Sequence, residues 1–544
     1  MPTITLNKKE FEKLVGKKLP IEKLKDRISL LGTDLEDIKD NEINVEIFPN
    51  RPDLLSEQGF ARAFSSFIGV KTGLREYKVK KSEHKVIVDK SVTMRPYTVC
   101  ALVKNLKLND ERIRQLMQIQ EKLSTTHGRA RKKSEYGIYP SDKIKFPITY
   151  IAKDPKKVYF KPLGMNKEIR ADKVEQSHKT GREFAHITKK WKKYPFFIDN
   201  ENKVLSMLPY TNSNDVGKIN ESTKEVFIEC TGIDLNNVNV ALNILVTTLA
   251  DMGGEIHSLQ IVYPDKTITT PNLKPEKLKI NLEYVNKILG LNLKEAEIKK
   301  YLERMGYDYK NKTVSIPSYR ADILHQIDLI EDIAIAYGYE NFKQEIPKVA
   351  TIGSESKMSI IKNKIANLLT GLTLTEVSTY ALSNNYTQNK HMNTKLDLIH
   401  LKNSVSSEYN VLRTWLLPSL LEVLKNNKHN EYPQIIFEMS TIFKKGSSET
   451  GTEENERLCI LLHNKTTTFT EIKQVLDYLF NSLNIKYTIK ETEHPSFIPG
   501  RTARVSVNNK EIAYIGEIHP KVLKNFDLEL PVAALELNLT ELFT

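Results

Sequence analysis

The sequence has little cysteine and none of the short motifs that mark the commonest enzymes. Its three cysteines, Cys100, Cys230 and Cys459, are widely separated. That spacing excludes a Cys-x-x-Cys zinc or redox motif and argues against a disulfide framework. The chain contains no P-loop, no Gly-x-Gly-x-x-Gly, no His-Glu-x-x-His and no Gly-x-Ser-x-Gly. The sequence therefore does not point to the common kinases, dinucleotide enzymes, zinc proteases or α/β-hydrolases.

Long apolar segments are also missing. No uninterrupted apolar run is long enough to span a bilayer, and no apolar leader follows Met1. With 544 residues, 40% of them hydrophobic and 27% charged, the composition is that of a globular protein with several domains. We expect a cytoplasmic protein that has no membrane partner.

Basic residues outnumber acidic residues, which indicates a polyanionic partner. The net charge is +13 and the pI is near 9.1, values that favour nucleic acid. Basic residues cluster at 129–133 and, interleaved with aromatic residues, at 189–194. Each cluster alone is also compatible with a solvated face, but together they predict contacts with phosphate and salt-sensitive binding.

One segment of this basic chain is conspicuously acidic. After Arg320, apolar residues recur at steps of three and four through Ile323, Ile327, Ile330, Ala334 and Tyr337, which predicts an amphipathic helix that ends at Gly338. The carboxylates of this segment are Asp322, Asp328, Glu331 and Asp332. The last three share one helix face, and Asp322 can cap the helix or join them. Oxygen ligands of this kind suit Mg²⁺, whereas a solvated acidic face is the alternative.

Composition and periodicity divide the chain into four predicted domains. These are residues 1–82, 83–268, 270–346 and 350–544, with both helices and strands in each. The third is expected to contain two helices, the acidic helix and a hairpin that turns at Asn311-Lys312. In the fourth, the polar stretch 446–456 is expected to be disordered.

Several segments together resemble one family, the phenylalanyl-tRNA synthetase β subunits. Asn50-Arg51-Pro52-Asp53-Leu54-Leu55-Ser56 is similar to that family's NRPDxLS element. The other matching segments, in the family's order along the chain, are 204–207 with 227–232, then 320–323 with 328–332 and 336–339, and finally 497–501 with 516–520. The chain ends just after the last of them, so we expect the short archaeal and eukaryotic-cytosolic branch.

The resemblance implies an α2β2 heterotetramer in which the α subunit attaches phenylalanine to its tRNA with ATP and Mg²⁺. It also implies a multidomain α+β fold. Its parts would be a mixed α/β editing domain, a small helical and hairpin domain, and a C-terminal class II synthetase-like antiparallel-sheet domain without catalysis. In the family, Asp322, Asp328, Glu331 and Asp332 would be Mg²⁺ ligands. An alternative is that this acidic face pairs with basic residues of the partner subunit.

The resemblance further implies hydrolytic editing of tyrosine mischarged onto the tRNA. An apolar pocket rejects an added hydroxyl only weakly, so a second pocket must read the phenol with a polar group. By alignment with the family, the candidates for lining that pocket are Leu205, Asn212, Ser213 and Asp234. A positioned water is expected to attack the ester, since no His near Ser213 in sequence could activate it. Asn212 and Ser213 are also compatible with a plain turn, and Asp234 with a plain helix cap.

The chain departs from its relatives at one edge of this expected pocket. Where they carry Gly-Thr-His-Asp, it has Gly137-Ile138-Tyr139-Pro140, with Asp142 following. A Met-Pro-Pro run is replaced by Met207-Leu208-Pro209. These changes leave a second function open, that of a non-catalytic scaffold and tRNA-binding subunit whose editing activity is lost.

Overall fold

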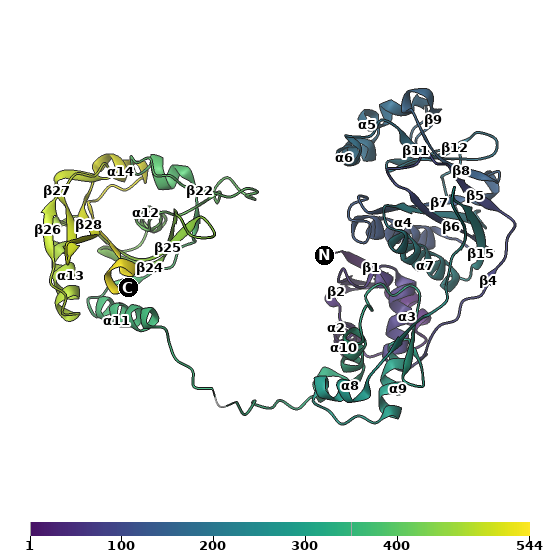
Figure 1. Cartoon of the computed structure of the whole chain (residues 1–544), viewed down its shortest axis with the longest axis horizontal. Helices are drawn as coiled ribbons and strands as arrows, with labels where there is room; N and C mark the ends of the chain where they lie inside the picture. The colour runs from purple at the N-terminus through teal and green to yellow at the C-terminus, as the bar shows by residue number, and fades with distance from the viewer. Residues whose placement is uncertain (1, 350) are drawn as a thin grey trace. The chain divides into compact units, whose positions relative to one another are not determined.

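The computed structural model describes residues 2–349 and 351–544, which form two compact units, Met1–Ile346 and Pro347–Thr544 (Figure 1). The predicted domain starts at residues 1 and 350 lie outside the described residues, and the four predicted domains remain predictions. Several separate sheets and many helices make the chain a multidomain α+β protein. In the described part of the chain, every helix is too short or too polar to cross a membrane.

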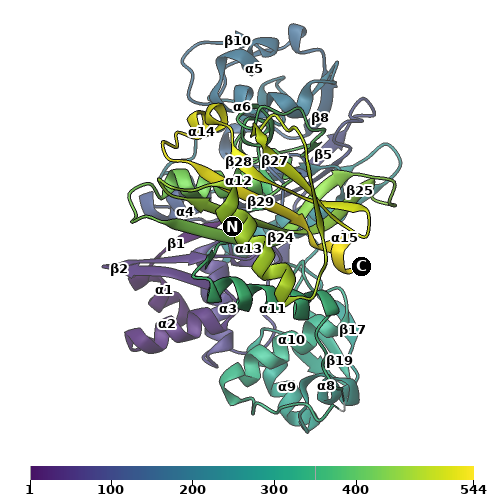
Figure 2. The same ribbon diagram turned by 90° about the vertical axis from the view of Figure 1, so that its left-hand side faces the viewer.

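The N-terminal part of the first unit is a three-stranded antiparallel sheet covered by helices (Figure 2). Its strand order is β1-β3-β2, and alternate residues of β3, Ile43 and Val45, are buried as the period of two predicts. The turn Asn50–Leu55 leads into α3, whose N-cap Ser56 accepts a hydrogen bond from Gly59 N at 3.0 Å. The elements are β1 (Thr3–Asn7), α1 (Lys8–Val15), α2 (Ile21–Leu30), β2 (Asp34–Lys39), β3 (Glu42–Glu46) and α3 (Glu57–Phe67).

An 11-stranded mixed sheet forms the middle of the first unit. Its main path runs β13-β12-β11-β8-β5-β15-β6-β14-β7, and β4 and β16 also pair with β15. The strands are β4 (Val79–Lys80), β5 (Lys85–Val88), β6 (Tyr97–Lys104), β7 (Ser134–Pro140), β8 (Ile148–Lys153), β11 (Tyr194–Ile198), β12 (Val204–Met207), β13 (Thr211–Asn212), β14 (Val226–Gly232), β15 (Glu255–Val262) and β16 (Thr267–Thr270). The accompanying helices are α4 (Asp110–Thr125), α5 (Val174–Ser177), α6 (Lys179–Thr188) and α7 (Leu235–Asp251), and a two-stranded ribbon joins β9 (Tyr159–Phe160) to β10 (Ile169–Arg170).

The two faces of this sheet bury different cores, and strand alternation decides which residue faces which. In β14, Val226, Ile228 and Cys230 belong to the core that contains the apolar face of α7, which Figure 1 shows against the sheet. Phe227 belongs to the core on the other face. Glu229 and Thr231 follow Phe227 at steps of two, so their side chains lie on the face away from α7.

The last part of the first unit carries the acidic segment. Three strands pair in the order β17-β19-β18, with the predicted turn at Asn311 and Lys312, whose φ angles of 51° and 57° are left-handed. The elements are β17 (Glu276–Lys279), α8 (Leu282–Leu289), α9 (Glu295–Arg304), β18 (Asp308–Lys310), β19 (Thr313–Ile316) and α10 (Gln326–Tyr337).

The predicted apolar stripe of the acidic helix is only partly right. Ile330 and Ala334 are buried, but Ile327 is 39% exposed. Leu329 and Ile333 are buried in its place. The helix starts at Gln326 rather than beside Ile323, so it turns a different face to the core, and Asp332 is buried with that face.

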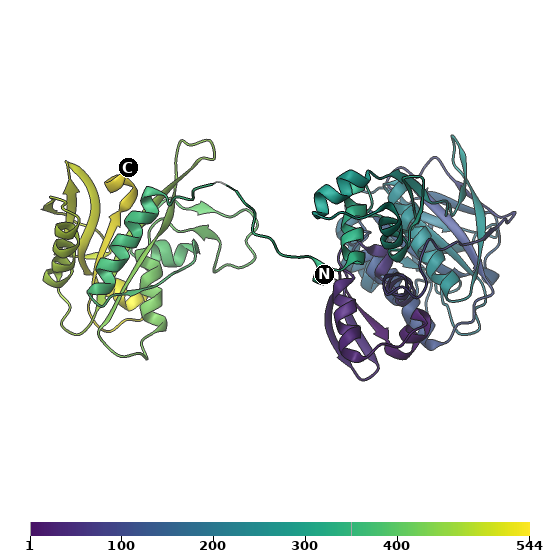
Figure 3. The ribbon, with the colours of Figure 1, turned by 90° about the horizontal axis from the view of Figure 1, so that it is seen from below.

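The second unit is a seven-stranded sheet with helices on both faces (Figure 3). Its order is β20-β24-β25-β29-β28-β27-β26, antiparallel except for the β20–β24 pair. In β25, Leu458 and Ile460 pack with α11 and α13, whereas Cys459 and Leu461 pack with α12 and α14. The main elements are α11 (Lys357–Gly371), β20 (Thr375–Glu376), α12 (Leu417–Asn426), β24 (Gln434–Lys445), β25 (Thr452–His463), α13 (Phe469–Ser482), β26 (Thr488–Glu491), β27 (Phe497–Val507), β28 (Lys510–Ile518), α14 (Pro520–Asn525), β29 (Val532–Asn538) and α15 (Leu539–Phe543); a small separate sheet joins β21 (Leu382–Ser383), β22 (Ile399–His400) and β23 (Val411–Leu412).

The stretch 446–456 was expected to be disordered, and that prediction is wrong. β24 continues to Lys445 and β25 begins at Thr452, so only a short turn separates two long paired strands. The polar residues of the stretch alternate along a hairpin that projects beyond the core, where polar side chains on both faces are stable in water.

Candidate functional site

The acidic segment is built around one buried arginine. Arg320 donates from Nε and Nη2 to the two carboxylate oxygens of Asp322, at 2.8 and 2.7 Å, and from Nη2 to Asp332 Oδ2 at 2.8 Å. Tyr307 also donates to Asp332 Oδ2, and the Arg320 guanidinium lies 5.2 Å from the Tyr307 ring centroid. Burial would raise the pKa of Asp322, but Arg320 and then Arg51 outweigh it and hold that pKa below its usual range.

A second turn of the same design lies close to the first. Arg51 donates from Nε and Nη2 to the two oxygens of Asp53, both at 2.9 Å, and both side chains are buried. Burial and Arg320 would lower the pKa of Arg51, but Asp53 and Asp322 outweigh them and raise it. The two Arg-x-Asp turns, at 51–53 in the first predicted domain and 320–322 in the third, therefore place their buried charges near one another.

The predicted Mg²⁺ ligands do not converge on one point in this arrangement. Asp322 and Asp332 are both engaged by Arg320. Asp328 Oδ2 accepts from the N–H groups of Leu324 and His325, at 2.8 Å each, as part of a capping box. Among the described residues, no three His, Cys, Asp or Glu side chains are grouped so that they could hold a metal ion. Three of the four carboxylates are thus engaged by partners within the chain, and the Mg²⁺ site stays a prediction.

A groove of about 940 Å³ runs along the acidic segment. Its lining includes Asp328 and Glu331 together with Arg129 and Lys133, which come from the predicted basic cluster 129–133. Arg131, from the same cluster, turns inward instead and donates to Glu135 Oε1 at 2.8 Å and Pro209 O at 2.9 Å. The cluster 129–133 therefore presents only part of its charge to a partner.

A buried acid lies in the strand that precedes α7. Glu229 is fully buried on the β14 face opposite to α7. Burial, and next the nearby Glu135, raise the pKa of Glu229 to about 8. Its Oε2 has no hydrogen-bond partner among the described residues. A neutral carboxyl with one unsatisfied oxygen is the state that this position favours near pH 7.

The phenol of Tyr139 contacts this acid directly. Tyr139 OH lies 2.9 Å from Glu229 Oε1 and 3.2 Å from Asn212 Oδ1. In the β7–β14 register Gly137 is the residue opposite Glu229. A Cβ at Gly137 would lie 2.6 Å from Glu229 Oε1 and 2.3 Å from Tyr139 OH, so any side chain there would displace one of them. The absence of a side chain at 137 thus makes room for the contact.

The four predicted pocket residues fall into two groups. Leu205 is buried in the same core as Tyr139. Asn212, on β13, contacts the Tyr139 hydroxyl, and Ser213 N donates to Leu205 O at 2.7 Å. Asp234 is the N-cap of α7, accepts from Asn237 N at 3.0 Å and pairs with Lys133 at 3.3 Å. In the described structure no hydrogen bond or ion pair links Asp234 to the other three.

Glu229 and Tyr139 were not among the predicted site residues. A signal for Glu229 was present, because a lone acid stands in the otherwise uncharged run Val226-Phe227-Ile228-Glu229-Cys230, and charged residues are almost never fully buried without a partner. Tyr139 was noted only as a departure from the family. Its contact with Glu229 depends on the pairing of β7 with β14, which the sequence does not reveal.

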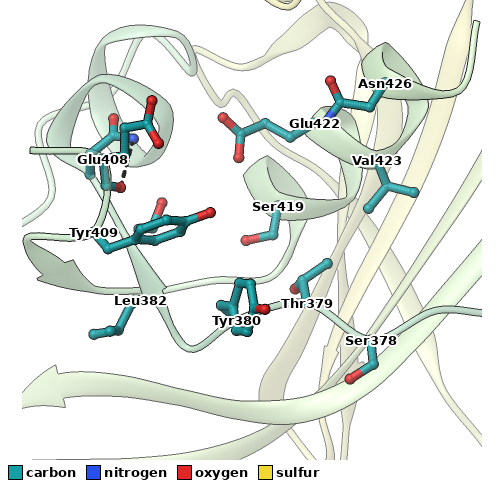
Figure 4. Close-up of a pocket in the computed structure, with 12 residues that line it drawn as sticks. Ser378, Thr379, Tyr380, Leu382, Glu408, Tyr409, Ser419, Glu422, Val423 and Asn426 are labelled. Carbon is teal, nitrogen blue, oxygen red and sulfur yellow. Dashed lines mark hydrogen bonds between the residues drawn. The ribbon is translucent and has the colours of Figure 1, made fainter. Parts of the chain in front are cut away.

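The second unit contains a polar pocket of about 430 Å³ (Figure 4). Figure 4 shows Tyr380 and Tyr409 on one side and Ser419 and Glu422, from α12, on the other. Arg413 is fully buried and donates to Glu438 Oε1 and to Oγ1 of Thr379, a residue of the pocket lining, both at 2.9 Å. These internal contacts engage the guanidinium, which is therefore not available to bind a ligand.

Comparison with known proteins identifies the family. The chain matches the model for the phenylalanyl tRNA synthetase beta chain CLM domain over residues 343–539 and that for the tRNA synthetase B5 domain over residues 278–339. It is 40% identical over 568 residues to the phenylalanine–tRNA ligase beta subunit of Thermococcus gammatolerans, covering 100% of this chain and 99% of that one. For the same subunit of Pyrococcus furiosus the identity is 41% over 557 residues, with 100% of both chains covered.

A solved structure agrees with these matches. An N-terminal fragment of the phenylalanyl-tRNA synthetase beta subunit from Pyrococcus horikoshii is 39% identical, with a TM-score of 0.60, and covers 62% of this chain and 100% of the fragment. The full-length similarity includes the NRPD and RxDI segments, the acidic helix and the C-terminal region. The chain belongs to the phenylalanine–tRNA ligase beta subunit family and is thus a subunit of an aminoacyl-tRNA synthetase.

Proposed function

We propose that this chain is the non-aminoacylating subunit of a cytoplasmic phenylalanine–tRNA ligase. It pairs with an α subunit in an α2β2 heterotetramer, binds the tRNA for phenylalanine, and supports ATP-dependent attachment of phenylalanine by the α subunit. The observation that carries the proposal is the identity of about 40% over the whole chain to beta subunits of this ligase. The exposed lysines of 189–193 supply a basic surface suited to tRNA phosphates.

The second unit supports the absence of aminoacylation chemistry in this chain. It has the antiparallel sheet expected of a class II synthetase-like domain. Arg413, however, is enclosed by Glu438 and Thr379. Its Nε and Nη2 also donate within the chain, to Thr441 O and Ser440 Oγ, so all three nitrogens of this buried guanidinium are engaged away from any ATP phosphate. We therefore assign catalysis of aminoacylation to the α subunit.

Hydrolytic editing of tyrosyl-tRNA is the second activity that we propose for the first unit. Glu229 and Asn212 offer buried and half-buried oxygens that a phenol hydroxyl would satisfy and phenylalanine would leave unpaired. Hydrolysis adds water to the ester carbonyl, the ester bond breaks, and the ribose oxygen leaves with a proton. Ser213 is not a suitable nucleophile, since it is buried and its Oγ accepts from Asp215 N.

The alternative is a scaffold and tRNA-binding subunit in which editing is lost. The replacement of the family's Gly-Thr-His-Asp by Gly137-Ile138-Tyr139-Pro140 favours it, because the Tyr139 ring fills space beside the two hydroxyl-reading oxygens. The two functions differ only in deacylation and make the same demands on tRNA binding and on pairing with the α subunit.

Magnesium is proposed as the cofactor of the ligase reaction. A further structural Mg²⁺ at Asp322, Asp328, Glu331 and Asp332 would require Arg320 to release two of these carboxylates. Equilibrium dialysis of the full chain against Mg²⁺ tests this site. Stoichiometric binding that Glu331→Ala abolishes would support it, and binding below 0.1 equivalent at millimolar Mg²⁺, on the order of the weakest protein sites, would rule it out.

The experiment for the main proposal is reconstitution with the α subunit. We expect ATP-dependent phenylalanylation of the tRNA by the complex and none by either subunit alone. Phenylalanylation by this chain alone, or its failure to restore activity to the α subunit, would contradict the proposal. Incubation of the complex with tyrosyl-tRNA then separates editing from scaffolding: deacylation faster than in buffer supports editing, and deacylation at the buffer rate supports its loss.

A further inference from the structure

The oxygens best placed to read a tyrosyl hydroxyl are already in contact with a tyrosine of the chain itself. Tyr139 OH lies 2.9 Å from Glu229 Oε1 and 3.2 Å from Asn212 Oδ1. A phenol has one proton to donate. A second phenol that enters from solvent would therefore compete with Tyr139 for the same two oxygens.

The Tyr139 ring is as firmly held as its hydroxyl. The side chain is fully buried and packs with Leu205 and Phe227 in one core, with the Phe227 ring centroid at 5.9 Å. Burial, and next Glu229, raise the pKa of Tyr139 far above its usual range, so the phenol stays neutral and keeps its proton for the contact.

The space between Gly137 and this contact is closed. Gly137 leaves no room for even one added carbon beside Glu229 Oε1 and Tyr139 OH. Asn212, by contrast, is half-buried. Removal of the Tyr139 ring would free the Asn212 and Glu229 oxygens that its hydroxyl contacts. Glu229 Oε2 has no partner in the described structure.

We propose that Tyr139 is an internal occupant of the hydroxyl-reading pocket and that a tyrosyl group can enter only when Tyr139 leaves. This inference rests on the editing site proposed above and deepens it, because it names the residue that decides whether that site is open. The replacement of the Tyr139 ring by a small side chain would create a cavity that carries a hydroxyl acceptor. Such a cavity takes a para-hydroxylated ring in preference to a plain one.

Binding of tyrosine amide to the full-length chain tests the occupant directly. The test variants are Tyr139→Val, which suits a strand, and Tyr139→Ala, and each is checked for folding by its melting curve. We expect tyrosine amide to bind Tyr139→Val at least about tenfold more tightly than it binds the natural chain. Phenylalanine amide, which lacks only the hydroxyl, is the matched ligand, and we expect it to bind the variant about tenfold more weakly, the factor for one buried hydrogen bond.

Two further variants separate the effect of the cavity from the effect of the hydroxyl acceptor. Tyr139→Phe keeps the ring and removes the hydroxyl, so it opens no cavity and should bind tyrosine amide no better than the natural chain. Adding Glu229→Leu to Tyr139→Val keeps the cavity and removes the acceptor, so the preference for tyrosine amide over phenylalanine amide should vanish. Rescue of that preference in Tyr139→Val with Glu229→Gln would support the acceptor role of position 229.

Two outcomes would overturn the proposal. One is binding of tyrosine amide to the natural chain as tightly as to folded Tyr139→Val. The other is a folded Tyr139→Val or Tyr139→Ala that shows no preference for the hydroxylated ligand. Failure of editing gives a different pattern: Tyr139→Val binds tyrosine amide selectively, yet its complex with the α subunit deacylates tyrosyl-tRNA no faster than buffer.

Discussion

Glu229 shows what the burial of a single acid does to this molecule. It lies fully buried on a strand, beside a phenol on one oxygen and without a partner for the other in the described structure. Near neutral pH a carboxyl in such surroundings holds its proton. Its effect on stability therefore has the opposite pH dependence to that of a salt-bridged carboxylate such as Asp322.

Replacement of Glu229 by glutamine should change the pH dependence of stability. The folded pKa of about 8 lies above the unfolded value of roughly 4.3. The natural chain therefore has its full stability from this group below about pH 4 and loses it as the pH rises to 8. Glu229→Gln does not titrate, so its free energy of unfolding, relative to the natural chain, should rise by at least about 1 kcal/mol between pH 5 and pH 8.5. Denaturant unfolding at both pH values measures this.

Two controls accompany that measurement. Burial, and next Glu111, raise the pKa of Glu57 to about 8, so Glu57→Gln should show a change of the same sign. The exposed Glu449→Gln should show no pH-dependent difference. An unchanged difference between pH 5 and pH 8.5 for Glu229→Gln would mean that Glu229 is ionised in the folded chain.

Helices α7 and α10 depend on side chains at their N-terminal ends. Asp234 caps α7, and Asp328 closes a capping box at the start of α10. Arg320, which precedes α10, also holds Asp332 in its middle. The contacts of these residues thus show that the predicted functional residues of both helices also have structural roles.

Asp234 can be tested as a cap and as a pocket residue in one experiment. Asp234→Ala removes the acceptor for Asn237 N and should lower the free energy of unfolding by about 1 kcal/mol. Asp234→Asn keeps a capping oxygen and should lose at most a few tenths of that. If the residue also served in editing by its charge, both variants would slow deacylation of tyrosyl-tRNA equally while phenylalanylation is unchanged. Recovery of deacylation in Asp234→Asn would show that Asp234 acts only as a helix cap.

Arg320 provides the strongest test of the buried charges. Arg320→Met leaves Asp322 and Asp332 buried without their cation, which should lower the free energy of unfolding of the first unit by about 3–5 kcal/mol. Arg170 makes the same two-pronged contact with Asp172, with 2.7 Å from Nε to Oδ1, but near the surface. Arg170→Met is the matched control and should leave stability nearly unchanged. Equal effects of the two substitutions in denaturant unfolding would refute the role assigned to burial.

Elements were easier to predict than their contacts. The hairpin turn at Asn311-Lys312 and the existence of the acidic helix follow from local patterns, because turn residues and periodicity act over a few residues. The burial of Asp332 was not predicted, since it depends on Arg320 and Tyr307 from outside the helix. Similarly, Asn212 was proposed for the pocket from the family alone, whereas its partner Tyr139 comes from a distant strand.

At the scale of the whole molecule, each unit has its own hydrophobic cores. Among the described residues, the first unit contains three cores and the second contains two, which lie on the two faces of its sheet. A region that has its own core is able to fold alone. The solved N-terminal fragment of the Pyrococcus horikoshii relative, which covers 62% of this chain, agrees with such independence.

Residues 1–346 should therefore fold without the rest of the chain. We expect the fragment to be monomeric and to unfold in a single cooperative transition, with a midpoint within about 3 °C of the corresponding transition of the full chain, a shift below roughly 1 kcal/mol. Differential scanning calorimetry of both proteins measures this. A fragment that lacks a cooperative transition would show that the first unit needs the second.

The two Arg-x-Asp turns, at 51–53 and 320–322, lie in two of the segments in which the chain resembles its family. They sit in different parts of the sequence, yet each lies within the electrostatic field of the other. A substitution that discharges one turn exposes the other to an unbalanced buried charge. The two should consequently vary together among relatives, so that lineages which have lost Arg51 have also altered Arg320 or its acids. These residues would then be retained because they stabilise the first unit, rather than because they take part in a reaction.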